Sequence, residues 1–289
     1  MTSDFLLATR REMHSDACAE LELVRARRCF KSLSLILARL SGLNVPRSLL
    51  MLEMNEDALD SLSKDLGLPI MIRMDYGSLP PQKYLGGIPV LTRKTMSKVA
   101  QFLLANGFYP LFQAHLDRFK DLRSAGVLFD TDSHHTHIEL VGPGFDASDL
   151  RLGHFTPHEQ ITVDLSEPSW EGRSVISHQL YAQQRRERFL KCRRLMAYTD
   201  HFNRTGILLS SLDAVDPAPV RAVSRVVTVP KEYVPTPDDL VLSLLDESRA
   251  LHSRVLPGLP SSESFVASFS YLAGTGWVLW DVYGQWYRR

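Results

Sequence analysis

The first half of the chain alternates between stretches with a helical hydrophobic period and short apolar runs. The helical period predicts three helices, at 15–41, between Asn55 and Gly67, and at 92–106. Gly42 is expected to end the first helix, and Asn55 is suited to cap the second. The apolar runs indicate short buried strands, at 48–52, 69–74 and 109–113.

The second half predicts paired strands, then helices, then a final hairpin. Four strands are expected, at 124–130, 136–141, Phe265–Tyr271 and Trp277–Tyr283, and polar and apolar residues alternate from Val278 to Tyr283. A turn near Asp132 would join the first two strands, and Gly274 lies at the tip of the last hairpin. Helices are expected at 177–203 and 238–256. This order of elements predicts an α+β fold with mostly antiparallel sheets.

Composition narrows the class of protein. The 289 residues include 33 Lys and Arg and 33 Asp and Glu, and this zero net charge argues against a generic polyanion binder. Hydrophobic residues make up 44% of the chain, which excludes wholesale disorder. The cysteines form no CxxC motif, so neither a zinc knuckle nor a redox pair is expected. Without a signal peptide or a long apolar run, we expect a cytoplasmic protein with no membrane partner.

Several motifs follow one another in a fixed order between Lys31 and Asp130. A lysine on a helix comes first, followed by a turn that runs from a glycine to a proline. A second proline then begins a strand that ends in a positively charged residue. After it come two short stretches with glycines, a strand that contains a glutamine, and a strand that contains a glycine. These motifs are Lys31, Gly42–Pro46, Leu66–Arg73, Tyr76–Ser78 with Gly86–Ile88, Leu111–Leu116 and Ser124–Leu128. Their ordered spacing resembles the ATP-grasp superfamily.

The resemblance continues at the C-terminus, where the sequence also departs from the family. Asp281 stands in place of a metal-binding glutamate, and Tyr283 stands where the family has an asparagine. Ser268 or Ser270 occupies the position of the first acid. Only a short segment precedes Lys31 in this sequence, so we expect an ATP-grasp relative without a full pre-ATP domain. The resemblance therefore implies an ATP-grasp relative with a divergent metal site.

The architecture implied by this resemblance is ATP-grasp-like, with two small α+β lobes of mostly antiparallel sheets enclosing a nucleotide cleft. The parts would be an N-terminal helical segment, a small lobe with a glycine flap, and a large lobe with a helical insertion, at 1–45, 46–116 and 117–289. The implied cofactors are ATP and Mg²⁺.

The resemblance also assigns nucleotide contacts in the small lobe. Lys31 and Arg73 would hold phosphates, although Arg73 could instead form a salt bridge with Asp75 at the strand end. Gly86 and Gly87 would let the backbone flap approach the phosphates closely. The adenine would be bound by the strand end and hinge, at Gln113, Ala114, His115 and Leu116.

A loop rich in acids and glycines follows the strand that ends near Glu139. Asp281, together with Glu139 or Asp146, would hold magnesium, and Arg151, the second catalytic residue besides Arg73, would orient an acceptor carboxylate. The alternative interpretation is a solvated turn in which Asp146 caps a short helix and Arg151 pairs internally.

Three other features have both a plain and a functional interpretation. The histidines at 134–137 could bind a metal ion, but a hairpin tip facing water is the simpler interpretation. His158 and Glu159 could be catalytic, but a polar loop is the simpler interpretation. The cations at 185–194 could bind phosphates or an acidic partner, or could simply face solvent.

Two functions follow from these interpretations. The first is an ATP-dependent ligase that activates a carboxylate as an acylphosphate for attack by an amine or thiol. The second is a non-catalytic nucleotide-binding subunit of ATP-grasp type. The missing front domain implies a homo-oligomer or a protein partner that covers the exposed face. Nucleic acid is not an expected partner.

Overall fold

The computed structural model describes residues 5–7, 17–75, 88–90, 92–114, 123–131, 134–142, 159–165 and 236–284. Within these ranges, residues up to 40 and from 45 to 114 belong to one compact unit. Residues 41–44 and those from 123 onward belong to a second unit. Each unit contains one five-stranded sheet in which all strand pairs are antiparallel. The predicted α+β class with antiparallel sheets is therefore confirmed.

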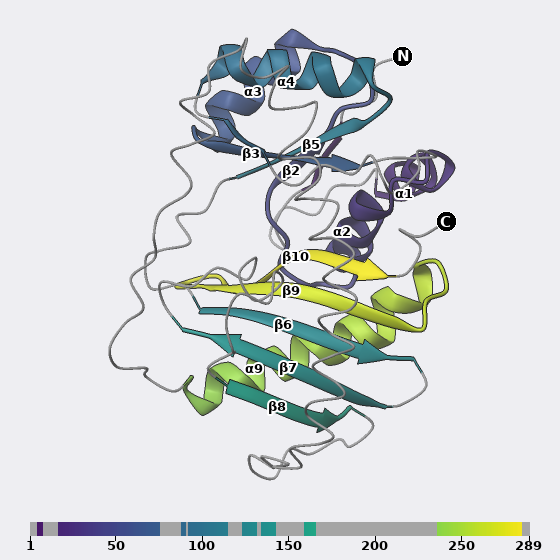
Figure 1. Ribbon diagram of the computed structural model, residues 1–289, viewed down its shortest axis with the longest axis vertical. Helices are drawn as coiled ribbons and strands as arrows, with labels where there is room; N and C mark the ends of the chain where they lie inside the picture. The colour runs from purple at the N-terminus through teal and green to yellow at the C-terminus, as the bar shows by residue number, and fades with distance from the viewer. Residues whose placement is uncertain are drawn as a thin grey trace. The chain divides into compact units, whose positions relative to one another are not determined.

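The first sheet has the strand order β1-β2-β5-β3-β4. Its strands are β1 (Phe5–Leu7), β2 (Ser48–Leu50), β5 (Tyr109–Ala114), β3 (Ile70–Asp75) and β4 (Ile88–Val90). Helices α3 (Glu56–Leu66) and α4 (Arg93–Ala105) cover one face, and α2 (Phe30–Leu40) lies on the other (Figure 1). The helices and strands predicted between residues 48 and 114 are confirmed, whereas the short edge strands β1 and β4 were not predicted.

The single helix predicted at 15–41 is wrong, because the structure has two helices, α1 (Ala17–Ala26) and α2. Arg28 between them adopts φ 57°, a left-handed conformation that is uncommon for a residue with a side chain. The N–H of Cys29 donates to the carbonyl of Val24 at 2.9 Å, which closes a Schellman ending of α1. Such endings usually contain glycine, so the sequence carried no signal for this break.

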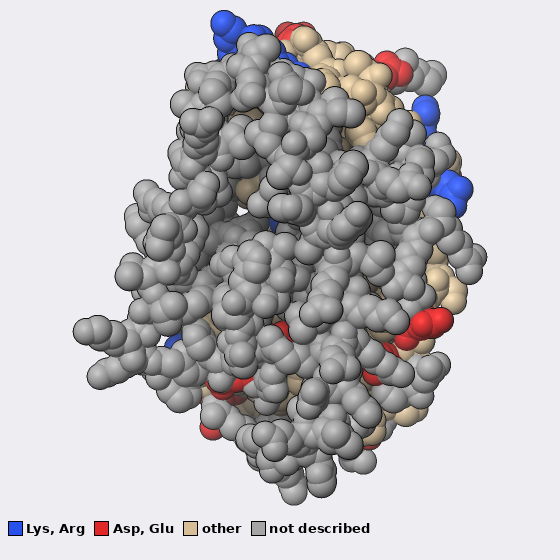
Figure 2. All heavy atoms as spheres, viewed as in Figure 1, with Lys and Arg blue, Asp and Glu red and all other residues tan. Residues whose placement is uncertain are grey.

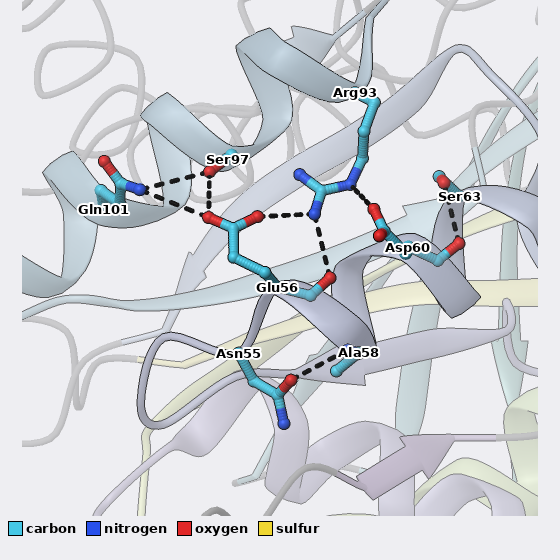
Figure 3. Close-up of polar contacts among 8 residues, drawn as sticks. All are labelled: Asn55, Glu56, Ala58, Asp60, Ser63, Arg93, Ser97 and Gln101. Carbon is cyan, nitrogen blue, oxygen red and sulfur yellow. Dashed lines mark hydrogen bonds and ion pairs between the residues drawn. The ribbon is translucent and has the colours of Figure 1, made fainter.

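Helices α3 and α4 are joined by polar side chains at the surface (Figure 3). The Nε of Arg93 donates to Asp60 at 2.6 Å, and its Nη2 donates to the carboxylate of Glu56 at 2.6 Å. Ser97 also donates to Glu56, at 2.6 Å. These hydrogen bonds lower the pKa of Glu56, Ser97 contributing most and Arg93 next. One arginine fork therefore ties the start of α4 to two turns of α3.

Replacing Arg93 by alanine is expected to lower the melting temperature by about 2–4 °C, because it removes a partly exposed pair of ionic contacts. Lysine at this position should restore only part of the loss, since a point charge cannot hold both carboxylates with a planar fork. The difference in melting temperature between the unchanged chain and the alanine variant should shrink at high salt, where surface charges are screened. A thermal melt at low and high salt measures it, and an unchanged melting temperature at low salt would contradict the expectation.

The second sheet has the strand order β10-β9-β6-β7-β8. Its strands are β10 (Gly276–Gly284), β9 (Ser264–Leu272), β6 (Arg123–Asp130), β7 (His135–Val141) and β8 (Glu159–Asp164). The two predicted hairpins are confirmed. The loop predicted at Glu159 is wrong, because this residue begins the edge strand β8. Its carboxylate accepts a hydrogen bond from the backbone N–H of Thr236 at 2.7 Å.

One face of the second sheet is apolar and is covered by a helix (Figure 1). This helix is α9 (Asp238–Ala250), which continues through a π-helical turn at Leu251–Val255 and a 3₁₀ turn at Leu256–Gly258. Trp277 of β10 donates its indole N–H to the carbonyl of Leu240 at 2.8 Å. Phe129 of β6 stacks on His252 with ring centroids 6.0 Å apart. The core of this unit therefore lies between the sheet and α9.

No helix within the described ranges is long and apolar enough to cross a membrane. On the face shown in Figure 2, Lys and Arg side chains of the described part of the first unit are interspersed with Asp and Glu. The basic run at 185–194, which carried the phosphate-binding alternative, lies outside the described residues.

Candidate functional site

In the first unit, charged residues gather on the face of the sheet against which α2 packs. Arg73 and Asp75 are two positions apart on β3, so both side chains project from this face. Asp75 accepts hydrogen bonds from the backbone N–H groups of Lys31, at 3.4 Å, and Ser32, at 2.7 Å, in the first turn of α2. Of the two residues suggested as phosphate ligands, Lys31 therefore lies beside Asp75, and Arg73 lies two positions along β3 on the same face.

Asp75 caps α2 from a neighbouring strand. The N-terminal N–H groups of a helix have no partner within the helix, and the helix dipole stabilises a negative charge there. The side chain is nevertheless buried, with 2% of its surface exposed. Burial raises the pKa of Asp75 to about 6, while hydrogen bonds from Ser32 and the charge of Lys31 limit the rise. A buried carboxylate with a pKa of about 6 thus lies next to Lys31, on the face of the sheet from which Arg73 also projects.

Gln113, the predicted adenine residue on β5, shares this face of the sheet. It lies directly opposite Met71 in the register of β3 and β5. Arg73 is two residues after Met71 on β3, so its side chain projects from the same face. The side chain of Gln113 is fully buried, and its Nε2 donates to Oγ of Ser48 at 3.1 Å. Ala114, the next predicted residue, ends β5 and is half-buried. Two motifs far apart in sequence therefore meet on one face.

In the second unit, the face opposite α9 carries polar residues in one cross-strand row. Asp281 on β10 pairs with Ser268 on β9, which pairs with Gly126 on β6, and Gly126 pairs with Glu139 on β7. Directly paired residues project from the same face of a sheet. Asp281 and Glu139, the two described carboxylates suggested for magnesium, therefore lie in one row, and Gly126 places no side chain between them.

A β-bulge turns Asp281 toward this polar face. Leu279 pairs with Phe269 on the apolar face, and the next pair is Asp281 with Ser268, so Trp280 is an extra residue. In a regular strand Asp281 would project from the same face as Leu279. The inserted residue reverses the alternation, as bulges near functional sites commonly do. Asp281 is fully buried on the polar face as a result.

Glu139 lies beside a histidine on β7. Nε2 of His137 is 3.9 Å from Oε1 of Glu139, and Nδ1 of His137 is 3.2 Å from Oγ1 of Thr162 on β8. His137 is 2% exposed and Glu139 is fully buried. The expectation that this histidine faces water at a hairpin tip is therefore wrong, because it lies inside the sheet. Strand alternation alone did not reveal that both faces of β7 are covered.

The spacing of Asp281 and Glu139 tests their joint assignment to magnesium. Their backbones are three strand spacings apart, roughly 14 Å, so both side chains would have to reach along the row to bring their oxygens within the roughly 4 Å that separates two ligands of one Mg²⁺. The described part of the chain contains no group of three or more His, Cys, Asp or Glu side chains that could hold a metal ion. The described residues therefore do not fit a single Mg²⁺ held by both Asp281 and Glu139.

Six further residues suggested from the sequence lie outside the described residues. They are the flap glycines, two hinge residues and the polar residues of the loop after β7, namely Gly86, Gly87, His115, Leu116, Asp146 and Arg151. The described residues consequently form two candidate faces, each within its own unit: Arg73, Asp75 and Gln113 lie on one in the first unit, and Asp281 and Glu139 lie on the other in the second unit.

No family model and no curated protein matches this sequence. Solved structures are similar to it at low identity. D-alanine–D-alanine ligase from Bacillus anthracis complexed with ATP is 10% identical, with a TM-score of 0.43; the match covers 89% of this chain and 55% of that one. An ADP complex of PurK, an N5-carboxyaminoimidazole ribonucleotide synthetase, is 10% identical with a TM-score of 0.43, covering 94% and 52%.

The ATP-grasp ligase PsnB complexed with a minimal precursor is 12% identical with a TM-score of 0.38, and the match covers 91% of this chain and 53% of that one. This chain therefore spans little more than half the length of each of these three solved chains.

Proposed function

We propose that this protein is an ATP-dependent ligase of ATP-grasp type, which activates a carboxylate for attack by an amine or a thiol. The observation that carries the proposal is the meeting of Arg73 and Gln113 on adjacent strands and on one face of the first sheet. The ATP-grasp resemblance assigns these two residues to opposite ends of one nucleotide, although they are far apart in the sequence.

The residues on this face have the chemistry that a nucleoside triphosphate requires. Arg73 offers a planar fork of N–H donors, which matches phosphate oxygens in a bidentate way. Lys31 adds a second cation from α2, where its backbone N–H donates to Asp75. Gln113 supplies a buried amide at the adjoining position. Together they would orient the triphosphate rather than change covalently.

The proposed reaction has two balanced steps. An oxygen of the acceptor carboxylate forms a bond to the γ-phosphorus, and the bond from that phosphorus to ADP breaks. The amine then attacks the acyl carbon of the acylphosphate, inorganic phosphate leaves, and the amine loses a proton. Arg73 would stabilise charge on the transferred phosphoryl group, and Arg151 would orient the acceptor. No step is assigned to magnesium, because the described part of the chain contains no group of three or more His, Cys, Asp or Glu side chains that could hold the ion.

A non-catalytic nucleotide-binding subunit, acting in a homo- or hetero-complex, is the second candidate. The register favours it at one position, since the residue directly opposite Asp281 is Ser268 and not an acid. A hydroxyl there is a weaker ligand for magnesium than a carboxylate. Such a subunit would bind ATP without turning it over.

The two candidates separate in one experiment with the full chain. Binding of ATP is measured by calorimetry, and ADP release is measured separately with Mg²⁺, ATP and mixtures of carboxylates and amines. Release that depends on both acceptor classes supports the ligase. Binding without release supports the subunit, and a folded chain that binds no nucleotide contradicts both.

A further inference from the structure

We propose that Asn44 is a positioning residue, which holds the β-bulge of β10 at Trp280 and so fixes the direction in which the neighbouring Asp281 projects. Asn44 would act through the backbone of β10 and not on a substrate. The inference concerns how the fold presents Asp281, whether or not the chain binds a nucleotide. Its failure would therefore leave the proposed function standing.

The first observation is where Asn44 lies. The chain leaves the first unit after α2 ends at Leu40 and returns to it at Val45, and the residues between them, Ser41–Asn44, belong to the second unit. Asn44 lies beside Val278 in a parallel bridge. Val278 belongs to β10, which is the edge strand of the second sheet (Figure 1). A short segment far away in the sequence therefore lies along the outer edge of β10.

The second observation is that Asn44 binds β10 with both its side chain and its backbone. Nδ2 of Asn44 donates to the carbonyl of Thr275 at 3.0 Å and to the carbonyl of Trp277 at 3.3 Å. The carbonyl of Asn44 accepts from the N–H of Leu279 at 2.9 Å. Alternate residues of an antiparallel strand point their backbone groups away from the neighbouring strand, and at an edge these groups need another partner. Asn44 is this partner from the tip of the hairpin to Leu279.

The third observation is that these contacts end where the bulge begins. Leu279 is the last residue in register with β9 before the extra residue, Trp280, and Asp281 follows it. A bulge moves along a strand when the backbone on one side of it slips by a residue, which transfers the side chains concerned to the opposite face. Movement towards the hairpin tip would turn Leu279 out of the apolar face, and Asn44 opposes it by holding Trp277 and Leu279 in place. The bulge consequently stays directly before Asp281.

The direction of the Asp281 side chain depends on this placement. A bulge bends its strand and increases the local twist, so it re-aims the side chain beside it. Asp281 is fully buried and lies directly opposite Ser268. If the bulge moved towards the tip, Asp281 would keep its face of the sheet but would follow a regular residue and lose this added twist. Asn44 thus sets the direction of a buried carboxylate.

A further contact holds the segment Ser41–Asn44 at its other end. Nη1 of Arg254, in the π-helical turn after α9, donates to the carbonyl of Ser41 at 3.3 Å. This hydrogen bond is exposed and competes with water, so it should contribute less than the contacts of Asn44. Arg254→Ala is therefore a mild variant that loosens the same segment without changing Asn44.

Hydrogen exchange of the β10 amides tests whether Asn44 holds the strand. Asn44→Ala removes the bonds of Nδ2 but keeps the backbone carbonyl, and exchange at 276–279 should become about 10- to 100-fold faster. Asn44→Asp has nearly the same size but sets a carboxylate oxygen against the carbonyls of Thr275 and Trp277, so exchange should be at least as fast as in Asn44→Ala. A residue that only filled space would instead be replaced best by aspartate. Arg254→Ala should accelerate exchange about two- to fivefold.

The carboxyl carbon resonance of Asp281 tests whether Asn44 positions this side chain, and Asp281→Asn identifies the resonance by its loss. The resonance should shift in both Asn44 variants, because the bulge is no longer held before Asp281. Asn55→Ala is the matched control, since it removes another asparagine side-chain bond, the cap of α3 in the first unit. This control should leave the resonance of Asp281 and the exchange at 276–279 unchanged.

Two results would overturn the inference. Unchanged exchange at 276–279 in Asn44→Ala would show that Asn44 does not hold β10. Faster exchange with an unshifted Asp281 resonance would show that Asn44 stabilises the strand without positioning the carboxylate. Should neither Asn44 variant fold, Arg254→Ala has to show both the faster exchange and the shifted resonance, and the absence of either would overturn the inference.

Discussion

Replacing Arg73 by alanine is expected to weaken ATP binding about 10- to 100-fold, because a charge-assisted hydrogen bond to phosphate contributes roughly 1.5–3 kcal/mol. If the chain is a ligase, ADP release should fall further, by about a hundred- to a thousandfold, since charge on the transferred phosphoryl group loses its stabilising donor. Calorimetry and a coupled ADP assay measure the two effects separately.

Lysine at position 73 is the informative comparison. It keeps the positive charge but loses the planar fork, so affinity should lie between those of the alanine variant and the unchanged chain. Arg93→Ala is the matched control, because it removes an arginine of the same unit from a surface network between α3 and α4. That variant should bind ATP normally. An Arg73→Ala protein with unchanged affinity and ADP release would contradict the phosphate assignment.

Local sequence patterns predicted the central elements of the first sheet well. Asn55 does cap α3, with its side chain accepting from the N–H of Ala58 at 3.0 Å. The buried strands β3 and β5 follow continuous apolar runs. The strands that were missed, β1, β4 and β8, all lie at sheet edges. An edge strand pairs on one side only and can be short, so its hydrophobic pattern is weak.

The site depends on two features that periodicity cannot show. The left-handed Arg28 divides the N-terminal helical stretch and lets α2 begin where Asp75 can cap it. The extra residue Trp280 reverses the alternation of β10 and turns Asp281 to the polar face. Neither feature has a signal in the residue types, because a left-handed conformation is uncommon for arginine and the hydrophobic pattern does not mark the extra residue of a bulge. The sequence therefore identified residue types for the site but not the geometry that presents them.

The stability of the first unit is expected to depend on the protonation of Asp75. Its pKa is raised from 3.8 to about 6 in the folded chain, chiefly by burial. Between these values the folded state holds more protons than the unfolded state, so stability falls as the pH rises from 4 to 6. The contribution of Asp75 to stability is thus fully present below its unfolded pKa of 3.8 and is lost as the pH rises through its folded pKa of about 6. A shift of this size corresponds to about 3 kcal/mol.

Asp75→Asn tests this coupling, since asparagine is uncharged at every pH and keeps one oxygen for the N–H of Ser32. Urea unfolding of both proteins at pH 4, 5, 6 and 7 should show the unchanged chain losing about 3 kcal/mol relative to the variant. Asp65→Asn, which alters an exposed carboxylate of the same unit, should follow the unchanged chain. A constant difference between the unchanged chain and Asp75→Asn across this range would show that the carboxylate is ionised without cost. Burial would then not set its pKa, and the α2 amides and Lys31 would compensate the charge fully.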